Sequence, residues 1–172
     1  FFKSFLRVVV GVVCAGASTP ELSERLVFFE RAFDWDAARE SGRIEPKPGA
    51  DEAVDAADDR VCAADEALRE WLVGTRKKLG GSERDVNLVS ANKDTHLCEV
   101  SDALAGKVPA EWSREGKRKG FEKFDCPELK ALRAEREAAG EARELALENV
   151  LRALVAKFCD DWPRWRRAAE AA

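Results

Sequence analysis

The chain has 172 residues, of which 45% are hydrophobic and 36% are charged, and its formal net charge at pH 7 is -4. This length suffices for one ordinary domain or two small ones, and the balance of residue types is typical of long helices that bury one stripe. This net charge does not indicate a nucleic-acid-binding protein, so any such contact has to come from a local patch. The chain contains no Met and begins at Phe1, so we expect a fragment or a processed product.

The first predicted element is an apolar helix over residues 1–17. Lys3 and Arg7 interrupt this stretch, and its longest uncharged run, residues 8–17, is about half as long as a membrane span. We therefore expect a buried helix rather than a membrane segment.

A second helix is predicted to begin at Thr19 and Pro20 and to end at Gly42. Threonine is a common N-cap, proline fits the first helical position, and glycine is a common stop. The following residues 44–49 contain two prolines and are predicted not to be helical, with Pro48 and Gly49 at the centre of a type II turn.

A long helix is predicted over residues 51–79. Apolar residues repeat along it every seven positions, with a second set interleaved, which is the pattern of a helix that lies along a partner helix. The two sets are Val54, Val61 and Leu68, and Ala57, Ala64 and Trp71. Its first half is acidic, which makes that half a poor surface for DNA.

Short, β-branched segments follow the helix. Residues 86–89 and 95–100 are predicted to form a β-hairpin, with turn residues 92–94 between them. Two weaker strands, around Trp112 and around residues 121–124, are predicted to flank a loop over residues 114–120.

The last predicted helix begins at Pro127 and runs to about Arg167, with Pro163 expected to kink or end it. Its second half carries an apolar stripe of Leu147, Leu151, Leu154, Phe158, Trp162 and Trp165. The predicted fold is mainly α, with two long antiparallel helices that carry a small antiparallel β-sheet at their tip. Its predicted divisions are residues 1–84 (ascending arm), 85–126 (sheet) and 127–172 (descending helix).

This layout, together with particular residues, resembles the MutS family of DNA mismatch repair proteins. The similarity is collinear over residues 20–172 and rests on residues 32–35, 37–39, 42–46, 49–51, 54–55, 76–77, 97–100, 108–109, 119–121 and 127–129. It is strongest to the eukaryotic members that read single-base mismatches as half of a heterodimer. The chain has no Tyr, whereas the family often has tyrosines at the position of Val54, in the strand around residues 95–97, and near Phe124.

The resemblance implies levers that join a clamp to an ATPase domain, and a clamp that grips the duplex DNA backbone without sequence specificity. It implies a second MutS-family subunit as partner and a nuclear location, with ATP and magnesium bound in the full-length parent. This chain has no G-x-x-x-x-G-K-[ST] motif, so we expect no cofactor and no enzymatic activity here. The letters of the family's mismatch wedge occur at Phe28 and Glu30, but inside an amphipathic segment, where we assign them to packing.

The candidate DNA-binding residues form a basic segment over residues 114–123. Five cations stand there against Glu115 and Glu122, a local surplus of three. Phosphate binding needs cations, free amide groups and access, and such contacts carry no base information. The candidates are Arg114, Lys117, Arg118, Lys119 and Lys123, with Lys93 of the first hairpin turn added. The alternative is a solvated basic loop on a coiled-coil scaffold that binds only protein, which predicts an unbroken helical hairpin.

Other polar and aromatic residues are interpreted as structural. His96 is expected to be a strand residue, and Trp112 to pack in a core rather than to stack on a nucleotide. Asp160 and Asp161 are expected on the polar side of a helix. The five cysteines are dispersed without a CxxC pair, so we expect reduced, packed thiols and no metal site.

Overall fold

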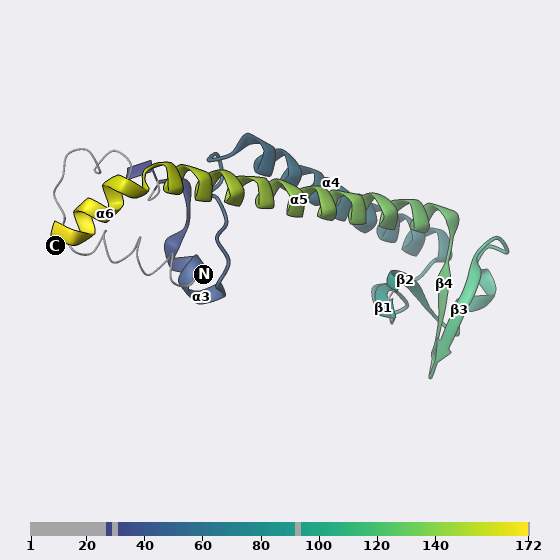
Figure 1. The fold of residues 1–172 in the computed structure, drawn as a ribbon. Helices are drawn as coiled ribbons and strands as arrows, with labels where there is room; N and C mark the ends of the chain where they lie inside the picture. The colour runs from purple at the N-terminus through teal and green to yellow at the C-terminus, as the bar shows by residue number, and fades with distance from the viewer. Residues whose placement is uncertain (1–26, 29–30, 92–93, 172) are drawn as a thin grey trace. The chain divides into compact units, whose positions relative to one another are not determined.

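The computed structural model describes residues 27–28, 31–91 and 94–171 (Figure 1). The predicted apolar helix over residues 1–17, the predicted helix start at Thr19 and Pro20, and Lys93 lie outside the described residues. The chain divides into two compact units, one of residues 56–143 and one of residues 1–55 and 144–172. No described helix has both the length and the apolar character needed to cross a membrane.

In the unit of residues 1–55 and 144–172, helix α3 (Trp35–Ser41) ends as predicted at Gly42, whose φ of 73° is left-handed. The prediction of one continuous helix up to Gly42 was wrong. Asp34 leaves the helical conformation, and its side chain accepts a hydrogen bond from the Ala37 N–H at 3.0 Å. This N-cap starts a new helix, and Phe33 instead pairs with Pro46 in an isolated antiparallel bridge.

The predicted turn at Pro48 and Gly49 is confirmed. The Ala50 N–H donates to the Lys47 carbonyl at 2.9 Å, and Gly49 has the positive φ, 81°, that a type II turn requires. Asp51 follows and caps helix α4 (Glu52–Leu79) by accepting hydrogen bonds from the N–H groups of Ala53 and Val54.

The core of this unit joins α3 and the bridge to the second half of helix α5 (Pro127–Asp160). Its buried members are Phe33, Ala38, Ile44, Leu154 and Phe158. Helix α5 ends at Asp160, as predicted from Pro163, and helix α6 (Trp162–Ala171) follows.

Two expectations for this part of the chain were wrong. Asp161 is 4% exposed and pairs with Arg164 at 2.9 Å, so it does not lie on a solvated face. Trp162, which was expected to extend the buried stripe of α5, is 48% exposed, because the stripe ends where the helix breaks.

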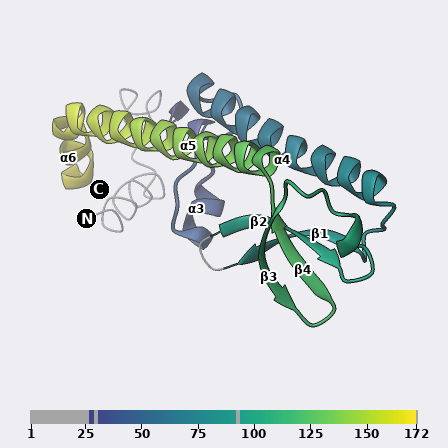
Figure 2. The ribbon, with the colours of Figure 1, turned by 90° about the vertical axis from the view of Figure 1, so that its right-hand side faces the viewer.

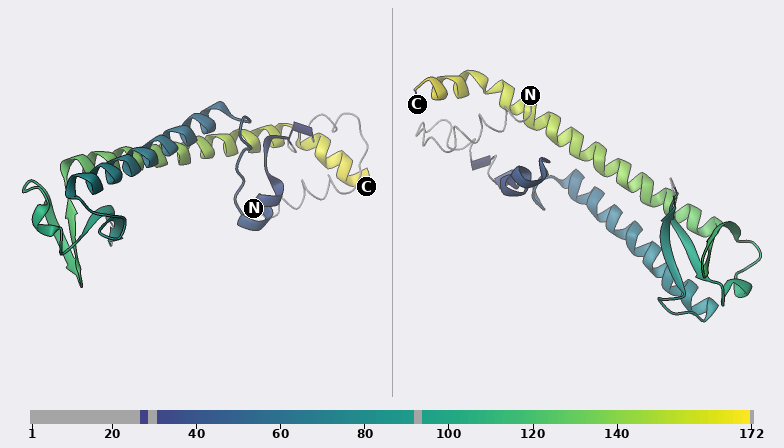
Figure 3. Two further views of the ribbon diagram at one scale, coloured as in Figure 1. Left: turned by 180° about the vertical axis from the view of Figure 1, so that it is seen from behind. Right: turned by 90° about the horizontal axis from the view of Figure 1, so that it is seen from below.

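In the unit of residues 56–143, α4 and α5 lie side by side and run antiparallel (Figures 1 and 3). Arg143 pairs with Asp58, Arg136 with Asp65 at 2.7 Å, and the Trp71 indole N–H donates to Glu128 at 3.2 Å. Along these contacts the residue numbers increase on α4 as they decrease on α5. This confirms the predicted antiparallel direction of the two helices within this unit. The seam buries small residues, Ala57 and Ala64 on α4 and Ala139 on α5.

Four strands lie between the two helices in sequence and form one antiparallel sheet in the order β1-β2-β4-β3. They are β1 (Val86–Ala91), β2 (Asp94–Ser101), β3 (Ser113–Arg118) and β4 (Phe121–Asp125). The predicted first hairpin is confirmed as β1 and β2. The predicted loop over residues 114–120 was wrong, because most of it is the edge strand β3, joined to β4 by the two-residue turn of Lys119 and Gly120.

One face of this sheet packs on the C-terminal part of α4 and the first turns of α5 (Figure 2). Trp112 joins this core, as predicted, and stacks on Trp71 with ring centroids 5.6 Å apart. The buried members of the core are Leu68, Leu79, Val86, Cys98, Val100, Leu104, Phe124, Cys126 and Leu129.

The packing of Leu68, which is 3% exposed, generates a stability prediction. Leu68→Asp should lower the free energy of unfolding by at least about 3 kcal/mol, because it removes a buried leucine and desolvates a carboxylate. Urea unfolding followed by circular dichroism measures the change. The control is Val73→Asp on the same helix, where the side chain is 46% exposed. Equal losses in the two variants would contradict the packing described here.

Candidate nucleic-acid interface

Five of the six candidate DNA-binding residues lie on the β3–β4 hairpin. Arg114, Lys117 and Arg118 are on β3, Lys119 is in the turn, and Lys123 is on β4. The sixth, Lys93, lies outside the described residues. The fold therefore gathers the five described candidates at one edge of the sheet.

Arg118 is held by a buried carboxylate on a different strand. Its Nε and one terminal nitrogen each donate to Glu99 of β2 at 2.6 Å, and Glu99 is 3% exposed. The hydrogen bonds to Glu99 raise the pKa of Arg118 above its ordinary value. The guanidinium also lies 4.7 Å from the centroid of the Phe121 ring. This pairing ties the edge strand to β2 across β4.

A second carboxylate, Glu122 of β4, gathers two more of the candidates. Arg114 donates to it at 2.8 Å and Lys117 at 3.1 Å, and the Glu122 side chain is 13% exposed. Lys117 also lies 3.4 Å from Asp102. Its hydrogen bond to Glu122 and the charge of Asp102 raise the pKa of Lys117. Both cations keep about half of their side-chain surface exposed.

Lys119 and Lys123 complete the hairpin and have no ion pair with any residue that the structure describes. Lys119 is exposed in the turn, and Lys123 is half-buried on β4, opposite Glu99 on one side and Gly116 on the other. A side-chain Cβ at Gly116 would meet no atom within 4 Å. The backbone of β3 is therefore open at this position.

The fold changes the charge balance that the sequence suggested. Glu99 and Asp102, which lie outside the basic segment in sequence, are brought against its cations. With Glu115 and Glu122, they set four carboxylates against five cations and leave a surplus of one. Sequence reasoning missed Glu99 as a site residue. The feature that could have identified Glu99 is its position in the strand. It is a charged residue between Cys98 and Val100, which are both buried.

Two buried cysteines also lie in this unit, and both are packing residues. Desolvation raises the pKa of Cys98 to about 12 and also raises the pKa of Cys126. Thiols of that kind are protonated at neutral pH and behave as small apolar side chains. Within the described ranges no three His, Cys, Asp or Glu side chains come together as a metal site.

Comparison with known proteins identifies the region that contains the hairpin. The sequence model of MutS family domain IV matches residues 49–142, more than half of the chain. The chain belongs to the MutS family. The resemblance that the sequence suggested is thereby confirmed, and the matched residues include all four strands of the sheet.

Individual relatives agree with this assignment. The DNA mismatch repair protein MSH6 of Arabidopsis thaliana is 33% identical over 96% of this chain, which covers 12% of that relative. The probable DNA mismatch repair protein Msh6 of Drosophila melanogaster is 28% identical over 97% of the chain and is covered to 14%. MSH3 of Pyricularia oryzae is 26% identical over 90% of the chain, again with 14% covered. The chain thus spans 12–14% of the length of these relatives.

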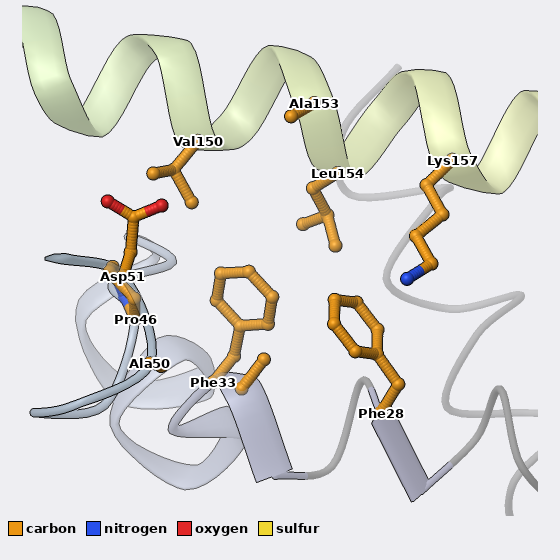
Figure 4. A pocket seen from close by; sticks show the side chains of 10 residues that line it. Phe28, Phe33, Pro46, Ala50, Asp51, Val150, Ala153, Leu154 and Lys157 are labelled. Atoms are coloured by element: carbon orange, nitrogen blue, oxygen red, sulfur yellow. The ribbon is translucent and has the colours of Figure 1, made fainter. Parts of the chain in front are cut away.

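The other unit of this MutS-family chain has a pocket of about 140 Å³, lined mostly by apolar side chains (Figure 4). Its two charged side chains are both occupied. Asp51 caps α4, and the Lys157 ammonium lies 3.4 Å from the centroid of the Phe28 ring. Since neither charge is free for a ligand, the hairpin is the stronger candidate site.

The Glu99–Arg118 pair gives a prediction for the MutS domain IV region. Arg118→Ala should lower the urea midpoint, because it leaves a buried carboxylate without its cation, and adding Glu99→Gln should restore much of the loss. The control is Arg69→Ala, which breaks the exposed pair with Glu66 and should leave the midpoint nearly unchanged. A rescue that fails, or a control that shifts as far as Arg118→Ala, would contradict a structural ion pair.

Proposed function

We propose that this chain is the part of a mismatch repair protein that grips the duplex DNA backbone. The observation that carries the proposal is the match of MutS family domain IV to residues 49–142, the region that folds into the sheet and its cationic hairpin. The relatives are named as DNA mismatch repair proteins. A protein that scans for mismatches has to hold DNA of any sequence. Contacts to phosphates provide binding that does not depend on the base sequence.

In this proposal the hairpin contacts phosphates, and its residues act in two ways. Lys119 and Lys123 meet DNA as cations without ion pairs among the described residues. Arg114, Lys117 and Arg118 are held in place by Glu122 and Glu99, and about half of each side chain is open to a ligand. Held cations lose less side-chain freedom when they bind than free ones do.

The proposal extends to the parts of the protein outside this chain. The two long helices act as a lever that links the clamp to an ATPase domain, where ATP and magnesium bind. The segment has no catalytic role of its own. The whole protein works in the nucleus with a second MutS-family subunit, on duplex DNA that contains mismatches.

The competing hypothesis is a coiled-coil scaffold that binds only protein. It requires an unbroken helical hairpin, whereas a four-stranded sheet stands between α4 and α5 in sequence. The sheet therefore favours the clamp.

The proposal is tested by Lys119→Gln with Lys123→Gln in the whole protein. These changes neutralise two cations without breaking an ion pair of the described chain. Duplex binding should weaken, and the slope of log K against log salt should become shallower by up to about 1.8, at about 0.9 for each lost phosphate contact. Matched and mismatched duplexes should lose affinity equally.

The control is Arg60→Gln with Arg69→Gln, which removes the same charge from exposed residues of α4. If the hairpin variant matched this control in affinity and salt slope, the hairpin would not be a DNA contact. If the hairpin variant lost only the preference for mismatched DNA, the hairpin would read bases, and the proposed sequence-independent binding would be wrong.

A further inference from the structure

We infer that a second cationic surface, at the C-terminal end of α4, binds phosphates of the same duplex and holds more uncompensated charge than the hairpin. The surface consists of Lys77, Lys78, Arg84 and Lys107, here called the α4-end cluster. The inference deepens the proposed function, since it takes the duplex as the ligand, but it rests on different residues.

The residues of the α4-end cluster come from three separate segments. Lys77 and Lys78 are in the last turn of α4, Arg84 is in the turn before β1, and Lys107 ends the short 3-10 helix η1 (Ala105–Lys107). The chain leaves α4 at Gly80, whose φ is 68°. The Lys107 ammonium lies 3.9 Å from the place where a Cβ at Gly80 would stand. The fold thus brings η1 against the end of α4.

The charge balance of the α4-end cluster decides its importance. Its four side chains are exposed and have no ion pair with any residue in the described ranges. Two carboxylates lie on the connection from α4 to β1, and a third, Glu111, lies four residues after Lys107. Glu83 is paired with Arg76, so that pair is neutral. Asp85 accepts hydrogen bonds from Ser82, which lower its pKa and keep it charged. Four cations against Asp85 and Glu111 leave a surplus of two, compared with one on the hairpin.

Helix electrostatics explain only part of the α4-end cluster. Cations in the last turn of a helix interact favourably with the helix dipole, and this accounts for Lys77 and Lys78. It does not account for Arg84, which comes from the following turn. The neighbouring Arg76 shows how a structural cation behaves here, since it is half-buried and donates to the Val86 carbonyl and the Asn87 side chain. The cluster residues are instead exposed.

The kind of ligand follows from this exposure. A site for one small anion needs a cradle of buried donors, and the α4-end cluster consists of exposed side chains from three segments. Spread cations suit an extended polyanion with repeated phosphates, such as duplex DNA.

The α4-end cluster and the hairpin belong to the same end of this unit. In all views the C-terminal end of α4 and the β3–β4 hairpin lie at the same end of the helix pair (Figures 1, 2 and 3). The connection from β2 to β3 passes both surfaces. At its start the Asp102 N–H donates to the Gly120 carbonyl at 3.0 Å, and five residues later Lys107 reaches the end of α4. The Asp102 carboxylate at the start of this connection is paired with Lys117.

The test neutralises one cation from each segment of the α4-end cluster: Lys77→Gln, Arg84→Gln and Lys107→Gln in the whole protein. On a fully paired duplex, affinity should fall roughly tenfold or more, and the salt slope should become shallower by up to about 2.7. The matched control is Arg60→Gln, Arg69→Gln and Lys130→Gln, which removes the same charge from exposed positions of α4 and α5. Equal affinity and slope in the two triple variants would overturn the inference.

A second measurement does not depend on how the variants fold. Lysine acetylation of the wild-type protein, with and without saturating duplex, should show Lys77, Lys78 and Lys107 protected by DNA and Lys130 unprotected. Unchanged acetylation of the three lysines would also overturn the inference.

The hairpin variants separate this inference from the proposed function. If Lys119→Gln with Lys123→Gln weakens binding and the α4-end variant equals its control, the inference fails and the proposed hairpin contact stands. If only the α4-end variant weakens binding, the inference stands and the hairpin does not contact the DNA backbone.

Discussion

The structure of the unit of residues 56–143 depends on one constraint, that one face of its small sheet has to be buried against the two helices. Cys98 and Val100 of β2 and Phe124 of β4 point to that face and pack against Leu68 and Leu129 of the helices. Side chains alternate along a strand, so Glu99 points to the other face. There it is covered by Arg118, whose guanidinium lies over the Phe121 ring. Burial of the apolar face therefore dictates where the buried carboxylate stands, and the carboxylate holds one of the candidate cations.

The helix pair supplies the surface on which the sheet rests. Arginines seven residues apart on α5, Arg136 and Arg143, face aspartates seven apart on α4, Asp65 and Asp58. Partly exposed ion pairs of this kind contribute little free energy each. Their common spacing instead fixes the register in which the small residues of the seam meet. At the start of α5 the buried Asp125 accepts hydrogen bonds from Arg133 and from the Cys126 N–H, which fixes the step from β4 into the helix.

Local patterns predicted the elements, and long-range contacts explain what the patterns missed. The heptad seam, the cap at Gly42 and the first hairpin are all encoded within a few residues, and each was predicted. The strand β3 was missed because an edge strand with exposed charges on both faces lacks the alternation that marks a half-buried strand. The break at Phe33 depends on the Asp34 side chain acting as a cap and on the bridge from Phe33 to Pro46, and the apolar spacing reveals neither.

The same distinction applies to the candidate site. The basic residues of the hairpin were visible in the sequence, but their carboxylate partners come from other strands and from the β2–β3 connection. Arg118 already uses its Nε and one terminal nitrogen on Glu99, so an incoming phosphate meets only the remaining N–H groups. Glu122 similarly shares its charge between Arg114 and Lys117. A surface whose cations are partly satisfied attracts phosphate less strongly than one of equal positive charge without carboxylates, because each contact also brings the phosphate near an anion. Affinity for a polyanion on such a unit is consequently governed by where the carboxylates are, not by where the lysines and arginines are most frequent in the sequence.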